Sequence, residues 1–83
     1  MDAASDATDL AVRTIERELE LVRGAVDMVA SGGAPRVQLA GLRFAGQLLA
    51  PARRMAVQAG VRIVPLWHAD EAGVDIAVEP IPG

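Results

Sequence analysis

The sequence contains no cysteine, lysine or tyrosine, and its aromatic residues are Phe44 and Trp67 alone. The absence of cysteine excludes disulfide frameworks and cysteine-based metal sites. The scarcity of aromatic residues, together with a formal net charge of −3, argues against a general nucleic-acid binder, because such proteins combine a basic surface with stacking side chains. We therefore do not expect nucleic acid as a partner.

Long apolar runs are also absent. None approaches the roughly 20 residues of a transmembrane helix, and the acidic start of the chain lacks the apolar core of a signal peptide. We therefore expect a cytoplasmic protein with no membrane partner, folded as a single domain over residues 1–83. A chain of this length buries only about 60% of its unfolded surface, so its monomer would be marginally stable.

Acidic residues are missing from one continuous stretch, between Asp27 and Asp70, which carries five arginines. Residues 1–27 hold seven acids against three arginines, and residues 70–83 hold four acids and no base. Such segregation predicts that oppositely charged elements meet within the fold, at a partner or at an anion.

The most regular pattern in the chain predicts a helix over residues 6–31. Ser5 or Asp6 is a suitable N-cap, and residues 1–5 are expected to be disordered. Gly32, Gly33 and Pro35 supply the C-terminal stop. Apolar residues recur at alternating spacings of three and four, which is a heptad seam: Val12, Ile15, Leu19, Val22, Val26 and Val29.

The remainder predicts a strand over 36–42, a helix over 43–59 closed by Gly60, and strands over 61–67 and 74–79. Pro51 falls on the polar side of the second helix, where it would kink that helix or else begin a new one. The order of elements is therefore α-β-α-β-β.

The fold class is α/β in the α+β sense: a long N-terminal helix and a β-α-β-β unit, with a three-stranded mixed sheet and helices on one face. Pro65 cannot donate to a ladder, which places the second strand at an edge and favours the order 1-3-2. Opposing Trp67 to Val74 pairs Ile63 with Val78 and Arg62 with Glu79. The expected core face of the sheet is Val37, Leu39, Val61, Ile63, Trp67, Val74, Ile76 and Val78.

The first helix carries more apolar surface than one contact buries. A second stripe lies beside the seam and meets either the second helix or a second subunit. The free edge of the first strand also invites pairing with another chain. The interface candidates are Leu10, Leu21, Ala25, Met28, Val37 and Leu39.

One carboxylate, Glu18, falls inside the apolar arc of the first helix. A buried carboxylate needs a partner. Arg53 or Arg54 of the second helix could provide one, from the same or another chain. The alternative is that Glu18 lies at a groove edge and reaches water.

Residues suited to catalysis are few. His68, Asp70 and Glu71 share a hairpin loop and could bind a metal or move a proton, but their spacing matches no metal motif and a solvated turn explains them equally. The hydroxyl residues lie in or beside the first helix, far in sequence from His68. We expect no enzyme activity, no cofactor and no bound metal.

The segment from Leu39 to Leu66, with Gly41-Leu42-Arg43-Phe44 between a strand and a helix, is similar in layout to the middle of the STAS domains of anti-anti-sigma factors. The similarity covers about a third of the chain. The Asp-Ser-Ser/Ala-Gly motif with the phosphorylated serine is missing, so no functional residue is carried over. The resemblance implies at most a regulatory module.

The leading hypothesis from the sequence is a non-enzymatic regulatory module that forms a homodimer and acts as adaptor or regulator of a partner protein. The alternative is a binder of an anionic ligand or nucleic acid through the arginine-rich segment 36–62. The anion-binding candidates are Arg36, Arg43, Arg53 and Arg54.

Overall fold

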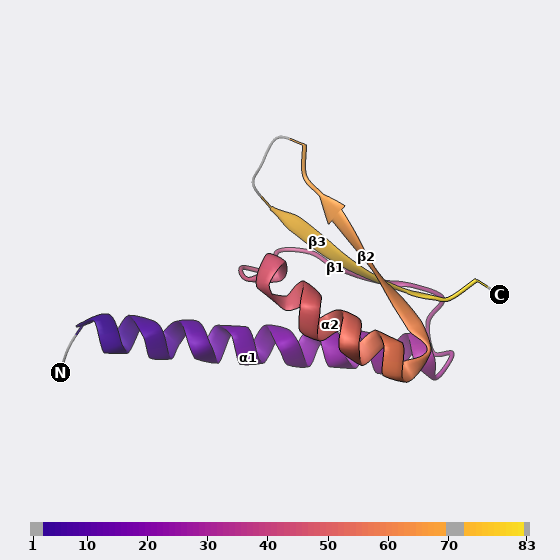
Figure 1. The fold of residues 1–83 in the computed structure, drawn as a ribbon, viewed down its shortest axis with the longest axis horizontal. Coiled ribbons are helices and arrows are strands. Elements are labelled where there is room, and N and C mark those ends of the chain that lie inside the picture. Colours follow the sequence, from indigo (N-terminus) through magenta and orange to yellow (C-terminus); the bar gives the residue numbers. More distant parts are fainter. Residues whose placement is uncertain (1–2, 70–72, 83) are drawn as a thin grey trace.

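The computed structural model describes residues 3–69 and 73–82. Its elements follow the expected order: α1 (Ala3–Ala30), β1 (Val37–Leu39), α2 (Ala45–Ala59), β2 (Val61–Trp67) and β3 (Val74–Pro80). The two helices pack on one face of a three-stranded sheet, which gives two layers (Figure 1). In the described part of the chain, neither helix combines the length and hydropathy needed to cross a membrane.

The sheet has the strand order β1-β3-β2, as the position of Pro65 predicted. The register of the β2–β3 hairpin is also confirmed, with Trp67 opposite Val74 and Arg62 opposite Glu79. One detail differs, because every ladder is antiparallel and the sheet is not mixed. The strands that run parallel, β1 and β2, are separated by β3 and never pair with each other.

Helix α1 begins earlier than predicted. Its backbone is helical from Ala3, so Ser5 and Asp6 lie inside the helix and do not cap it. The alanines that surround them favour helix over a cap at that point. The other end follows the prediction closely: Gly32 has a φ of 80°, and the N–H of Gly33 donates to the carbonyl of Met28 at 2.9 Å. This pattern is a Schellman C-cap, which a glycine at positive φ makes possible.

Strand β1 and helix α2 are both shorter than expected. The strand occupies Val37–Leu39 and not 36–42, and the helix begins at Ala45 and not at residue 43. The pairing ends at Leu39, and Gly41, with a φ of 74°, lies in the turn that connects β1 to α2. Helix α2 continues through Pro51 without a break and ends at Ala59, followed by the C-cap residue Gly60, whose φ is 76°.

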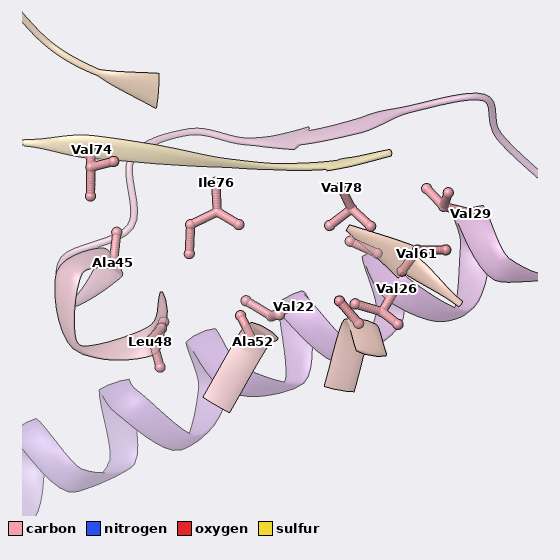
Figure 2. Packing of buried hydrophobic residues seen from close by; sticks show 12 residues of the cluster. Val22, Val26, Val29, Ala45, Leu48, Ala52, Val61, Val74, Ile76 and Val78 are labelled. Carbon is pink, nitrogen blue, oxygen red and sulfur yellow. The ribbon is translucent and has the colours of Figure 1, made fainter. Parts of the chain in front are cut away.

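The core lies between the sheet and the helices, with valines and alanines making up most of it. Figure 2 shows β3 pointing Val74, Ile76 and Val78 toward the helices. From the other layer, α1 contributes Val22, Val26 and Val29, and α2 contributes Ala45, Leu48 and Ala52.

Trp67 does not belong to this core, which corrects the prediction. Its surface is 68% exposed, although Val74 opposite it is buried. Trp67 is the last residue of β2, and the far end of the β2–β3 hairpin projects beyond the helices (Figure 1).

The first half of α1 extends beyond the rest of the fold. We call residues 3–14 the N-terminal arm, and Figure 1 shows it reaching past α2 and the sheet. The first seam residue that packs against the core is Ile15. Val12, one step earlier in the seam, is 46% exposed.

Candidate functional site

An apolar groove runs between α1 and the free edge of the sheet. Its volume is about 320 Å³. We call it the α1–β1 groove. It is lined by Glu20, Leu21, Gly24, Ala25 and Met28 from α1 and by Val37 and Leu39 from β1.

The groove brings together five of the six predicted interface residues. Leu21 and Met28 stand two helical turns apart on one stripe of α1 and are each about half exposed. Ala25 lies between them and is buried, while Val37 and Leu39 are half-buried. The groove therefore presents aliphatic side chains that the fold leaves partly uncovered.

Leu10, the sixth candidate, lies elsewhere. It belongs to the N-terminal arm and is 64% exposed. Eleven residues separate it from Leu21, which is about 16 Å along a helix. The helical pattern placed both leucines on one stripe, but β1 reaches only one of them.

The groove borders an unpaired strand edge. Within the described residues, β1 pairs with β3 alone, so its other side carries free backbone donors and acceptors. A strand at a sheet edge is a template for pairing with another chain. The opposite edge, β2, contains Pro65 at its centre and lacks one donor there. A binding partner at β1 could combine backbone hydrogen bonds with apolar contacts in the groove.

On the face of the sheet opposite the helices, Glu79 binds two arginines. Its Oε1 accepts from Nη2 of Arg62 at 2.7 Å and from Nε of the same residue at 3.0 Å. Its Oε2 lies 3.2 Å from Nε of Arg36. The Arg62–Glu79 pair confirms the predicted register. Arg36, predicted as an anion-binding residue, already has an internal carboxylate partner.

The lone histidine pairs with a residue that the sequence did not single out. His68 Nε2 lies 3.1 Å from Oδ1 of Asp75, and Gln38 Nε2 donates to Oδ2 of Asp75 at 3.4 Å. Asp75 is buried on β3, and the pair ties the end of β2 to the central strand. Its position on the outer face of β3, across the hairpin from His68, was available from the predicted register.

The proposed companions of His68 lie outside the described residues, because Asp70 and Glu71 fall within 70–72. In the described part of the chain, no group of three or more His, Cys, Asp or Glu side chains is placed to hold a metal ion. The His68–Asp75 pair can orient an imidazole, and its hollow is otherwise lined by Ala40, Gly41, Leu42, Gly73 and Val74, which offer no nucleophile.

The other arginine candidates do not form one pocket. Arg53 and Arg54 line a shallow hollow on α2 with Val57 and Gln58. Arg43 precedes the other end of that helix, about 15 Å away along its axis. Arg36 lies directly before β1. The four arginines are therefore separate, exposed cations and do not form a shared anion-binding site.

Glu18 has a structural partner that differs from the prediction. Its carboxylate accepts from the backbone N–H of Arg43 at 2.7 Å and of Phe44 at 2.8 Å, and does not pair with Arg53 or Arg54. It therefore caps α2 from another helix, where the residue at the cap position, Phe44, offers no side-chain acceptor. Two sequence signals predict this contact together: an acid in an apolar arc, and a helix start without a polar cap.

Comparison with protein-family models, with curated proteins and with solved structures finds no match for this chain.

Proposed function

We propose that the chain is a small non-enzymatic interaction module that forms a homodimer through the α1–β1 groove and acts as an adaptor or regulator of a partner protein. One observation carries the proposal: the groove lies directly beside the free edge of β1. A second copy would bring the same two features, a half-exposed aliphatic stripe and an unpaired strand. Closed dimers of this kind use one self-complementary patch on both copies.

The size of the chain favours self-association. A small domain with a single core is marginally stable alone, and association adds apolar burial that the monomer lacks. The large side chains left half exposed on α1 at the groove, Leu21 and Met28, are the ones that a dimer would cover. The alternative, binding of an anionic ligand or nucleic acid, has less support because the candidate arginines are dispersed and Arg36 is bound to Glu79.

The proposal is tested by the mass of the chain in solution. Light scattering or sedimentation at tens of micromolar is expected to give a dimer. The double variant Leu21→Glu with Met28→Glu is expected to give a monomer, because it places two carboxylates from each copy in the contact.

The matched control is Val57→Glu, since Val57 is 78% exposed on α2 and lies outside the groove. This variant is expected to remain a dimer. Circular dichroism verifies that each variant keeps its helix content. A monomeric native chain, or a groove variant that is folded and still dimeric, would overturn the proposal.

A further inference from the structure

The symmetry of a dimer formed at β1 is constrained by the placement of the helices. Both helices lie on one face of the sheet. If a joined sheet is to keep all helices on one face, the twofold axis must be perpendicular to the sheet. Residues that oppose each other in an antiparallel ladder point to the same face. A β1 residue that points to the helix side must therefore oppose a residue of the second copy that also points to the helix side.

Strand β1 has three residues, Val37, Gln38 and Leu39. Within this constraint, a single register pairs all three residues with strand residues of the second copy. It places Gln38 opposite Gln38 at the twofold axis. Centring the pairing on Val37 or Leu39 would leave two of the three strand residues of each copy without a strand partner.

Resting on the proposed homodimer, we infer that two copies join antiparallel through β1 with Gln38 at the axis. The product is a continuous six-stranded sheet in the order β2-β3-β1-β1-β3-β2. Each copy contributes the same edge, so the contact closes and does not extend into a fibre.

The side chains suit this register. On the helix side, Val37 of one copy opposes Leu39 of the other, and the pair occurs twice. These four aliphatic residues lie between the two α1–β1 grooves, where Leu21 and Met28 are half exposed. The register buries the groove residues by adding identical apolar surface from the second copy.

The charges near the axis are also compatible. Arg36 of one copy opposes Ala40 of the other, so no like charges face each other across the ladder. The Arg36 guanidinium is held by Glu79 of its own chain on the outer face. The other free edge, β2, has Pro65 at its centre, which removes a donor from any similar pairing there.

The required contact area is modest. A specific interface buries roughly 600 Å² or more on each partner, about a tenth of the 5571 Å² surface of this chain. The edge of β1 and the groove beside it are contiguous, so both contribute to one patch.

Disulfide trapping tests the register, because the native chain has no cysteine to interfere. Opposed residues at an antiparallel ladder have Cα atoms about 4.5–5.5 Å apart, which lies within the range of a disulfide, about 4.4–6.8 Å. Gln38→Cys is expected to form a disulfide-linked dimer under mild oxidation. Ala40→Cys is the register control: its two copies would lie four residues apart along the ladder, about 13 Å.

The expected result is that Gln38→Cys cross-links at least about tenfold faster than Ala40→Cys. A third variant, Gln47→Cys on α2, measures random collision. If light scattering gives a dimer but Gln38→Cys cross-links no faster than the two controls, the register is wrong and the proposed homodimer stands. Faster cross-linking of Ala40→Cys also overturns the register. A native chain that is monomeric at the same concentration overturns both proposals.

Discussion

The two halves of α1 carry the same apolar seam but meet different surroundings. In the second half, Val22, Val26 and Val29 are buried against the sheet and α2. In the N-terminal arm, Val12 of the same seam is 46% exposed. With 28 residues, α1 is about 42 Å long, and α2, with 15, is about 22 Å. The heptad spacing determines which face of α1 is apolar, whereas the length of its neighbours determines how much of that face is covered.

The largest loss of stability is expected from a charge placed in the buried half of α1. Val22→Asp places a carboxylate at a position that is 0% exposed, with no charged partner provided for it. We expect a loss of at least about 4 kcal/mol in the free energy of unfolding, enough to unfold a small domain. Chemical denaturation followed by circular dichroism measures it.

Val12→Asp is the matched variant in the arm. It makes the same chemical change in the same seam, and we expect its effect on unfolding to stay within about 0.5 kcal/mol. A comparable loss in the two variants would contradict the contrast between the halves of α1.

The next effect concerns the contact that anchors the buried half of α1 to α2. Glu18→Ala removes the acceptor of two backbone N–H groups, those of Arg43 and Phe44. Hydrogen bonds to a charged group contribute about 1.5–3 kcal/mol each, so we expect a loss of about 3 kcal/mol by denaturation. Glu18→Gln keeps one acceptor oxygen and should lose less.

Glu16→Ala controls for the loss of a carboxylate from α1, because Glu16 is exposed. Its expected effect is within about 0.5 kcal/mol. Equal losses for Glu16→Ala and Glu18→Ala would show that general charge on α1, and not the cap, is responsible.

The sequence predicted what depends on local patterns. The seam of α1, the closing glycines Gly32 and Gly60, and the hairpin register each follow from spacing or from one residue type. Pro65 predicts the strand order because proline lacks an N–H wherever it lies, and a central strand needs its donors on both sides. These features needed no knowledge of where the rest of the chain lies.

Features that depend on where an element ends relative to its neighbours were predicted poorly. Trp67 alternates with core residues, yet it extends past the helical layer and is exposed. For Glu18 the sequence predicts either an arginine partner or a position at a groove edge in contact with water, whereas its carboxylate accepts from two backbone N–H groups at the start of α2. Arg36 is predicted as an anion-binding residue, but it shares Glu79 with Arg62, because the carboxylate has two oxygens that can each accept.

The residues of the α1–β1 groove were also predicted only in part, because the sequence pattern does not show where β1 lies along α1. The excess apolar stripe on α1 is visible in the sequence pattern, and five of the six predicted interface residues converge on one surface. Leu10 was included because it shares the stripe with Leu21. Only the three-dimensional placement of β1 distinguishes the two leucines.

Single alanine substitutions at these two leucines should have the smallest effects, and they test whether the position of β1 distinguishes Leu21 from Leu10. Leu10 and Leu21 have similar exposure, 64% and 50%, and differ in what lies beside them. If the groove forms the dimer contact, Leu21→Ala removes buried apolar surface from both copies and should raise the dissociation constant about tenfold, or about 1.4 kcal/mol. Leu10→Ala should change it by less than about twofold, since the arm does not border β1. Sedimentation equilibrium over a range of concentrations measures both constants. Equal weakening by the two variants would place the N-terminal arm inside the contact and require an interface that runs along the whole of α1.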